Sequence, residues 1–287
     1  MLLGEEGGVE YRLASTMDGL YTPYALQRPA GDGPHPFVFL AYGNGGGGLD
    51  WLRDRVAGYP YVTRRLLAAG YACAWGRYRS EVELGYHTGG SLVRDRRQGM
   101  DLFNRAPLEF EDEVAILDDV RSLPGIDAAR IGHVGVSHAG EMLYKIASAY
   151  PDAVVAGVAC EPANHEFLDL DTDATATVNA DTGLRDIEQM QMRSAEYVRP
   201  RINAELVAER IAPIRTPILV MGRDGDHLQG IFRVSYDVLA EAGKDVEWVS
   251  YDHPLHGYIF PVGDAVDEIQ DRAVTGIVDY LDKHLTR

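Results

Sequence analysis

The chain has 287 residues, of which 46% are hydrophobic and 25% charged, and this composition supports a large folded core rather than disorder. With 44 acidic against 27 basic residues, the formal net charge is −17, which disfavours nucleic acid and anionic membranes as partners. Cys73 and Cys160 lie in apolar runs, so we expect reduced, buried thiols. The N-terminus lacks a basic segment followed by an apolar one, and no apolar run reaches membrane-spanning length, which predicts a cytoplasmic protein.

The first predicted elements are a hairpin and a buried strand. Residues 9–15 and 20–27 flank the turn signal Thr16-Met17-Asp18-Gly19, which favours a hairpin. The apolar run 37–41 predicts a strand buried on both faces, and a glycine run follows it up to Gly48. Such glycines serve either a tight turn or the approach of backbone N–H groups to an oxyanion. Leu49-Asp50 replaces the Lys-Ser/Thr ending of a phosphate-binding loop, and we favour the oxyanion role.

Helices and strands alternate along the rest of the chain. Spacing and apolar runs predict helices over 59–69, 110–120, 140–150, 231–242 and 266–281, and strands over 71–75, 130–136, 153–160, 217–221 and 246–251. Residues 76–105 are polar and arginine-rich, which predicts a long functional loop. Residues 163–210 are acidic without a strand-like run, and we expect an inserted helical cap there. The alternation predicts an α/β fold in a single domain over 1–287, with a mostly parallel central sheet flanked by helices.

One stretch combines a strand, a sharp turn and a helix around a serine. Gly135-Val136-Ser137-His138-Ala139 is a Gly-x-Ser-x-Ala variant of the nucleophile elbow. Small residues on both sides let the strand and the helix pass close together, so the turn would present the Ser137 hydroxyl at the carboxyl end of a sheet. Taken alone, the pattern also fits an ordinary tight turn.

Partners for this serine follow other predicted strands. A serine hydroxyl needs an adjacent base, and an imidazole base needs an acid that holds its tautomer. Acidic candidates are Asp224 and Asp226, and the histidine candidates are His253 and His256. The chain order of serine, aspartate and histidine is the order in an α/β-hydrolase.

These motifs together resemble α/β-hydrolases of the prolyl oligopeptidase and dienelactone hydrolase branch over nearly the whole chain. The matching segments are 15–19, 42–48, 125–131, 135–140, 222–227 and 256–258. The resemblance implies an α/β-hydrolase fold in which Ser137 is the nucleophile, His256 the general base and Asp226 the orienting acid. It also implies an oxyanion hole formed by the backbone N–H of His138 and by a donor from the loop that contains Tyr42, Gly43 and Asn44.

The resemblance has departures that leave alternatives open. The family usually places its aspartate three residues after the glycine, where this chain has Gly225, so we prefer Asp226 over Asp224. His256 precedes a glycine as in the family pattern, and we prefer it over His253. Asn44 stands where oligopeptidases often have a tyrosine, which leaves open whether the side chain of Tyr42 or a backbone N–H donates. No propeller precedes the hydrolase segment, which lowers the weight of peptidase activity.

Aromatic and methionine residues are the candidates for the substrate pocket, although for each of them taken singly ordinary packing is the more common role. We expect substrate contacts from Trp75, Tyr86, His87, Phe167, Met190 and Tyr258. The acidic residues Asp169, Asp171 and Asp173 are spaced as in a calcium loop, but Ala174 and Ala180 occupy its sixth and twelfth positions, so we interpret the run as a solvated loop. We expect no metal and no other cofactor.

The sequence therefore predicts a serine hydrolase that cleaves a small-molecule carboxylic ester through an acyl-enzyme. Amide or peptide cleavage and the opening of a lactone or dienelactone ring are the alternative reactions. A catalytically silent α/β-hydrolase fold that serves as a binding module is the alternative outside enzymes. The sequence leaves open whether the protein is a homodimer.

Overall fold

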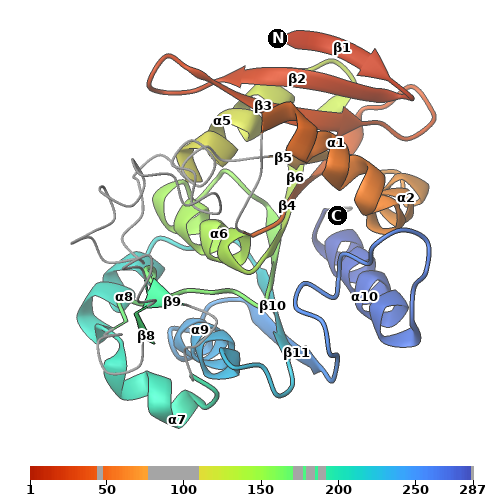
Figure 1. Ribbon diagram of the computed structural model, residues 1–287. Helices are drawn as coiled ribbons and strands as arrows, with labels where there is room; N and C mark the ends of the chain where they lie inside the picture. The colour runs from red at the N-terminus through yellow and green to blue at the C-terminus, as the bar shows by residue number, and fades with distance from the viewer. Residues whose placement is uncertain (44–47, 77–109, 171–176, 179–184, 187–191, 286–287) are drawn as a thin grey trace.

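A nine-stranded sheet forms the centre of the protein, as the computed structural model shows (Figure 1). The structure describes residues 1–43, 48–76, 110–170, 177–178, 185–186 and 192–285. The strands of the sheet are β1 (Leu2–Glu6), β2 (Val9–Ser15), β3 (Tyr21–Gln27), β4 (His35–Ala41), β5 (Ala72–Gly76), β6 (Ile126–Val136), β7 (Ala156–Cys160), β10 (Ile218–Arg223) and β11 (Val246–Tyr251). Their order across the sheet is β1-β2-β3-β5-β4-β6-β7-β10-β11.

The sheet has an antiparallel edge and a parallel centre. Strands β1, β2, β3 and β5 pair antiparallel, and β2 and β3 form the predicted hairpin, in register from Val9 opposite Gln27 to Ser15 opposite Tyr21. From β5 through β4, β6, β7 and β10 to β11 every pairing is parallel. The carboxyl ends of β4, β6, β7, β10 and β11 therefore lie along one edge of the sheet. The sequence does not predict β1.

Helices cover both faces of the sheet (Figure 1). The helices on one face are α5 (Phe110–Arg121), α6 (His138–Ala149), α8 (Ala204–Ile211) and α9 (Gln229–Glu241), and those on the other are α1 (Gly48–Gly58), α2 (Pro60–Ala68) and α10 (Glu268–Leu285). Residues 37–40 of β4 are fully buried between the two layers, as expected for a parallel strand covered on both sides. The mostly parallel sheet flanked by helices, predicted from the sequence, is confirmed.

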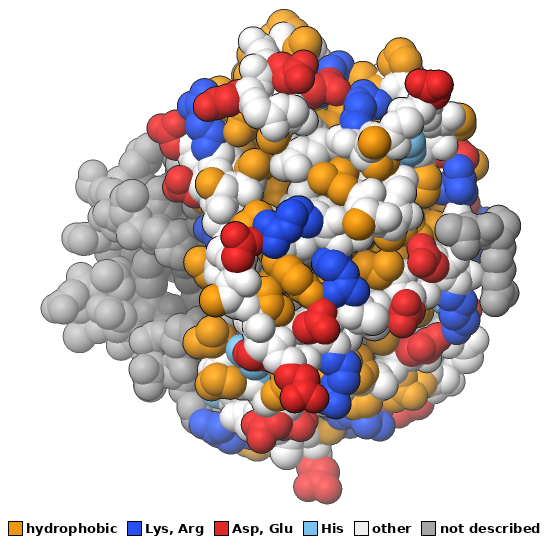
Figure 2. All heavy atoms as spheres, turned by 90° about the vertical axis from the view of Figure 1, so that its right-hand side faces the viewer, with side chains coloured by type: hydrophobic (Ala, Val, Ile, Leu, Met, Phe, Trp, Pro, Cys, Tyr) orange, Lys and Arg blue, Asp and Glu red, His pale blue; other side chains and the backbone are white. Residues whose placement is uncertain are grey.

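The face that carries α2 and α10 has acidic, basic and apolar side chains interspersed (Figure 2). Arg65 of α2 pairs with Asp271 of α10 at 2.6 Å, and Arg64 pairs with Asp264 at 2.6 Å. Exposed pairs of this kind contribute about 0 to 1 kcal/mol each, so the apolar contacts beneath them hold α10 in place. Among the described helices, none has the length and apolar character needed to cross a membrane.

The insertion predicted over 163–210 contains helix α7 (Ala195–Val198), the 3₁₀ helix η2 (Arg199–Arg201) and α8 in its described part. It also contains the short antiparallel pair β8 (Thr177–Val178) and β9 (Arg185–Asp186), which the sequence does not predict. Met192 and Val198 are buried against the helical layer around α9. A Cβ on Gly230 of α9 would lie 2.4 Å from the carbonyl oxygen of Ser194, so this glycine lets the insertion approach the helix. Its role as a cap stays a prediction.

Candidate active site

Ser137 is the single residue between the end of β6 and the start of α6, and its backbone conformation is strained. Its φ is 60° and its ψ −121°, a region that residues other than glycine rarely adopt. The turn is tight because its neighbours are small: a Cβ on Gly135 would lie 2.3 Å from the carbonyl oxygen of Ala139, and one on Gly140 would lie 3.0 Å from Cα of Pro162. The geometry is that of the predicted nucleophile elbow.

The end of β4 approaches the serine directly. A Cβ on Gly43 would lie 2.9 Å from Cβ of Ser137 and 3.3 Å from its Oγ, so only glycine permits this contact. Next to it, Tyr42 stacks on Tyr59, and its hydroxyl lies 2.6 Å from the place where a Cβ on Gly257 would stand. Burial raises the pKa of Tyr42 to about 12, which keeps its hydroxyl protonated. Gly43 thus lies beside Ser137 and Tyr42 beside Gly257. Their oxyanion role stays a prediction, and Asn44 lies outside the described residues.

His138 begins α6 immediately after the serine, and its side chain is buried. Its Nδ1 lies 3.2 Å from Oε2 of Glu141, while Oε1 of Glu141 accepts a hydrogen bond of 2.7 Å from the backbone N–H of Phe167. Burial raises the pKa of Glu141, but the charge of Lys145 and the contact with His138 outweigh it and hold the pKa near 2. The ionised Glu141 therefore fixes the first turn of α6, and the backbone N–H of His138 stays the predicted oxyanion donor.

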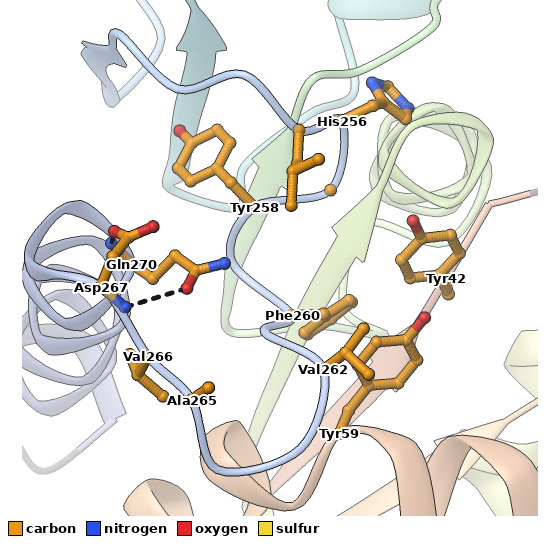
Figure 3. A pocket seen from close by; sticks show the side chains of 12 residues that line it. Tyr42, Tyr59, His256, Tyr258, Phe260, Val262, Ala265, Val266, Asp267 and Gln270 are labelled. Carbon is orange, nitrogen blue, oxygen red and sulfur yellow. Dashed lines mark hydrogen bonds between the residues drawn. The ribbon is translucent and has the colours of Figure 1, made fainter.

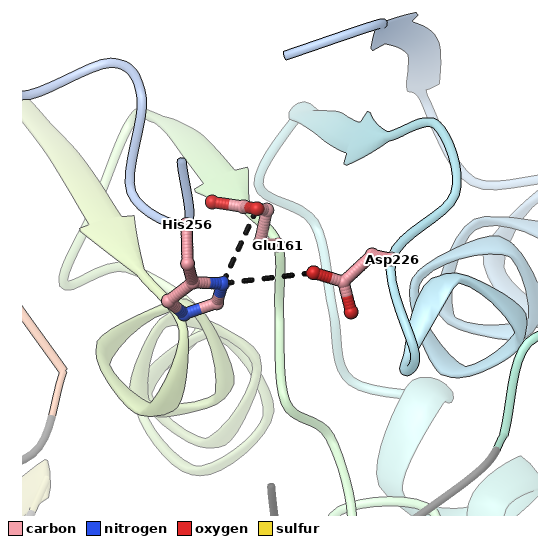
Figure 4. A group of neighbouring side chains, drawn as sticks. All are labelled: Glu161, Asp226 and His256. Atoms are coloured by element: carbon pink, nitrogen blue, oxygen red, sulfur yellow. Dashed lines mark ion pairs between the residues drawn. The ribbon is translucent and has the colours of Figure 1, made fainter. Parts of the chain in front are cut away.

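His256 lies in the loop after β11, where its ring meets two buried carboxylates (Figure 4). Its Nδ1 is 3.2 Å from Oε1 of Glu161 and 3.9 Å from Oδ2 of Asp226. His253, the alternative base, is turned toward the loop before α10, where its Nε2 lies 2.9 Å from Oδ2 of Asp267. Of the two histidines, the structure brings His256 to the acids.

Asp226 reaches the site from a glycine turn after β10. Gly225 before it has a φ of 75°, and Oδ1 of Asp226 accepts a hydrogen bond of 2.6 Å from the backbone N–H of Leu228. Burial raises the pKa of Asp226, but contacts with His256, Leu228 and Arg223 outweigh it and lower the pKa to about 2. Asp224 is exposed and accepts a hydrogen bond of 2.5 Å from Ser250, so it lies apart from His256.

Glu161 is a residue of this site that the sequence does not predict, and Arg223 is another. Glu161 follows β7 directly, has a φ of 49° and is completely buried. Its backbone N–H donates to the carbonyl oxygen of Met221 at 2.7 Å, and its Oε2 accepts a hydrogen bond of 2.6 Å from the N–H of Gly257. The signal that could have found it is a carboxylate directly after the wholly apolar run Ala156–Cys160, because such strand ends gather functional groups in parallel sheets.

Arg223 joins the two carboxylates. Its Nε donates to Oε1 of Glu161 at 2.8 Å, and its Nη2 donates to Oδ2 of Asp226. The oxygen atoms that pair with Arg223 are those that face Nδ1 of His256. Burial lowers the pKa of His256, but the two carboxylates outweigh burial and raise the pKa to about 10. The charged imidazole is therefore strongly stabilised.

The overall fold has counterparts among solved structures. A fungal esterase from Rhizomucor miehei superposes with a TM-score of 0.63 at 17% identity, over 97% of this chain and 84% of the other. The hyperthermophilic esterase of Pyrobaculum calidifontis gives a TM-score of 0.62 at 18% identity, over 97% of this chain and 86% of the other. The protein has the α/β-hydrolase fold.

Peptidases share the α/β-hydrolase fold with this chain as well. The acylaminoacyl peptidase of Pyrococcus horikoshii gives a TM-score of 0.63 at 16% identity over 97% of this chain. Dipeptidyl peptidase 4 of Porphyromonas gingivalis gives 0.60 at 16% identity over 96% of this chain. The chain spans 42% of the first peptidase and 35% of the second. No family model and no curated protein sequence matches the chain.

A cavity of about 550 Å³ adjoins His256 in this α/β-hydrolase fold (Figure 3). Tyr42, Tyr59, Phe260 and Val262 line one side of it, while the His256 ring points away from the cavity centre. Tyr258, a predicted substrate contact, also lines it. Aromatic and aliphatic walls of this kind suit an apolar group of a small molecule.

Two other predicted pocket residues, Trp75 and Phe167, do not line this cavity. Trp75 is 1% exposed, packs against Phe260 and donates from Nε1 to Oγ1 of Thr63 at 3.3 Å. Phe167 is buried with its ring edge-on to Tyr144. Tyr86, His87 and Met190 lie outside the described residues. Substrate contact by any of these residues stays a prediction.

The side chains of Glu161, Asp226 and His256 could offer ligands to a metal ion. The atoms of Glu161, Asp226 and His256 that would bind lie within 4.8 Å of one another. However, Arg223 already places a positive charge on both carboxylates, and a second cation there would face its repulsion. The donor set fits an imidazole and guanidinium network better than a metal centre.

Proposed function

We propose that the protein is a serine hydrolase that cleaves small-molecule carboxylic esters through an acyl-enzyme, with Ser137 as nucleophile and His256 as general base. The acid that orients the base belongs to the carboxylate pair of Asp226, which the sequence predicts, and Glu161. The observation that carries the proposal is the strained elbow of Ser137, at a φ of 60° with Gly43 against its Oγ. Backbone strain of this kind persists where the surrounding structure enforces it, and it concentrates at functional sites.

The proposed reaction has two half-reactions. Oγ of Ser137 attacks the ester carbonyl while Nε2 of His256, in the neutral form of the ring, takes the hydroxyl proton. The backbone N–H of His138 with a donor from the Tyr42 loop stabilises the oxyanion. Collapse of the tetrahedral intermediate breaks the bond between the carbonyl carbon and the alcohol oxygen, and His256 gives the proton to the leaving alcohol. Water then attacks the acyl-enzyme, His256 takes its proton and returns it to Ser137, and the carboxylic acid leaves.

The cavity beside His256 bears on the choice of substrate. Its aromatic and aliphatic lining suits an apolar acyl or alcohol group of limited size. The structural neighbours include both esterases and peptidases. Amide, peptide and lactone cleavage therefore stand as alternatives within the same chemistry.

A test of the proposal compares Ser137→Ala with the wild type on short p-nitrophenyl esters. We expect kcat to fall by about 10³-fold or more in the variant, because the nucleophile is lost. Ser122→Ala is the matched control, since Ser122 is exposed just after α5 and its hydroxyl donates to the carbonyl oxygen of Asp119 in that helix. Mass spectrometry after treatment with a fluorophosphonate should find the label on Ser137. Equal turnover by the variant and the wild type would contradict the proposal and favour a silent binding module.

Two further measurements sharpen the assignment. A panel of esters, lactones and aminoacyl amides, ranked by kcat/KM, decides among the alternative reactions. Addition of a chelator should leave ester turnover unchanged, because the proposed mechanism uses no metal.

A further inference from the structure

We propose that Glu161, rather than Asp226, is the carboxylate that accepts the Nδ1–H hydrogen bond of His256 and positions the general base; this inference rests on the proposed function. Asp226 then acts as a second carboxylate that shares Arg223 with Glu161. The site would thus have a nucleophile, a base and a pair of acids that arrive from two different strands.

The distances to the imidazole favour Glu161. Nδ1 of His256 lies 3.2 Å from Oε1 of Glu161, which is within reach of a hydrogen bond, and 3.9 Å from Oδ2 of Asp226, which is beyond it. Figure 4 shows the ring nitrogen between the two carboxyl groups. In the geometry observed, Glu161 is the carboxyl group nearer to the ring nitrogen, and the proposal assigns it the ring proton.

Glu161 also holds the backbone that carries the histidine. Its Oε2 accepts the N–H of Gly257 at 2.6 Å, the residue directly after His256. Gly257 has a φ of 73°, and a Cβ there would lie 2.6 Å from the hydroxyl of Tyr42. One carboxyl group therefore fixes both the ring and the main chain of the His256 turn, whereas Asp226 uses Oδ1 to hold its own loop at Leu228.

The backbone conformation of Glu161 indicates that the surrounding structure fixes the direction of its side chain. Among the described residues, Ser137, Glu161 and Asp169 are the non-glycine residues with positive φ. Ser137 and Glu161 follow the neighbouring parallel strands β6 and β7, and the N–H of Ser137 donates to the carbonyl oxygen of Cys160 at 2.9 Å. Adjacent strand ends thus carry the nucleophile and the acid in two strained turns that are joined by this hydrogen bond.

A purely structural role, as counterion of Arg223, is the competing explanation. Arg223 contacts both Glu161 and Asp226, so a counterion role alone would make the two carboxylates nearly equivalent for catalysis. A positioning role makes them unequal, because Glu161 lies nearer to Nδ1 of His256 and also accepts the N–H of Gly257.

The experiment compares Glu161→Gln, Glu161→Asp and Asp226→Asn, with Asp224→Asn as the matched control. We expect kcat for a p-nitrophenyl ester to fall about 10²- to 10⁴-fold in Glu161→Gln with KM within about threefold, as for loss of an orienting acid. Asp226→Asn should lose less, Glu161→Asp should recover at least about tenfold over Glu161→Gln, and Asp224→Asn should match the wild type. The acid limb of the kcat profile should move to lower pH in Glu161→Gln, because a negative charge beside His256 is removed.

A measurement that does not depend on turnover accompanies the kinetics. Histidine titration by ¹⁵N NMR should show a larger fall in the pKa of His256 in Glu161→Gln than in Asp226→Asn. If Glu161→Gln does not fold, Asp226→Asn decides alone, because a loss of kcat of about 10²-fold or more in that variant would assign the orienting role to Asp226 and overturn the inference. A larger loss of kcat and a larger fall of the His256 pKa in Asp226→Asn would overturn the inference. Full turnover by Ser137→Ala would instead overturn the proposed function, and the NMR comparison would still judge the role of Glu161.

Discussion

The carboxyl ends of β7 and β10 each deliver one buried carboxylate to His256, and they do so by different means. At β7, Glu161 is the first residue after the strand and takes a φ of 49° itself. At β10, a turn with Gly225 at a φ of 75° precedes Asp226, and the glycine takes the left-handed conformation at little cost. The first end is short and strained, whereas the second is longer and relaxed.

This difference bears on how each acid can be used. The glutamate side chain of Glu161, on a backbone with positive φ, contacts both His256 and the N–H of Gly257. The shorter side chain of Asp226 accepts hydrogen bonds from the backbone of Leu228 and from Arg223. The β7 end therefore has the better geometry for positioning the base, and the β10 end has the better geometry for holding Arg223.

The double variant Glu161→Gln/Asp226→Asn should have the largest effect. It removes both negative charges from His256 and leaves Arg223 beside the ring, so we expect the His256 pKa to fall from about 10 to near or below its ordinary value of about 6.5. We expect kcat to fall by about 10³-fold or more. The pH–rate profile and single-variant kinetics check this.

The combined loss should be smaller than the product of the two single losses, because both carboxylates act through one imidazole. If the fold-loss of kcat in the double variant equalled the product of the two single losses, the two carboxylates would act on different steps.

Arg223→Gln should mainly affect stability. Arg223 pairs with two buried carboxylates, and its removal leaves both without this cation. Breaking a buried ion pair in this way lowers the free energy of unfolding by about 3 to 5 kcal/mol. The acid limb of kcat should move to higher pH, since the loss of a nearby positive charge raises the pKa of His256 further.

Urea denaturation and the pH–rate profile measure both effects. Arg215→Gln is the control, because Arg215 pairs with Asp152 at 2.7 Å through side chains that are 66% and 87% exposed, and it should change the free energy of unfolding by less than about 1 kcal/mol. Equal destabilisation by both variants would remove the argument for a buried network.

Acid should weaken the fold through Asp226. Its pKa in the folded protein is about 2, below its ordinary 3.8, so its contribution is fully present above pH 3.8 and is lost as the pH falls through 2. The shift corresponds to about 2 kcal/mol in the free energy of unfolding. Asp226→Asn should flatten the stability curve between pH 4 and pH 2, as measured by urea denaturation, and an unchanged slope would contradict the lowered pKa.

Gly225→Ala should have the smallest effect. The residue has a φ of 75° with open space around the added Cβ, so only the left-handed conformation opposes the change, at about 1 to 2 kcal/mol in the free energy of unfolding. We expect kcat to stay within about threefold, because the Asp226 end is not the positioning one. Gly58→Ala is the control, since its surroundings are equally open and its φ is not in the left-handed region. A large loss of kcat in Gly225→Ala would reverse the division between the two ends.

The α/β-hydrolase fold and the position of the elbow follow from local patterns in the amino-acid sequence. Apolar runs such as 37–41 and helical spacing such as that of 110–120 report burial and periodicity, which are local properties. Small residues around Ser137 likewise indicate a close crossing of strand and helix, because their size is a property of the sequence alone. Strand β1, with five exposed residues, carried no such pattern and was not predicted.

Which charged groups contact one another depends on the folded arrangement of the strands. Glu161, Arg223 and His256 are separated by dozens of residues, and their contact follows from the parallel order of β7, β10 and β11. The sequence could rank Asp226 above Asp224 and His256 above His253 by motif, but it carried no measure of the distance from either acid to Nδ1. A difference of less than 1 Å between two carboxylates depends on strand register, side-chain length and a strained turn, and these come together only when the chain is folded.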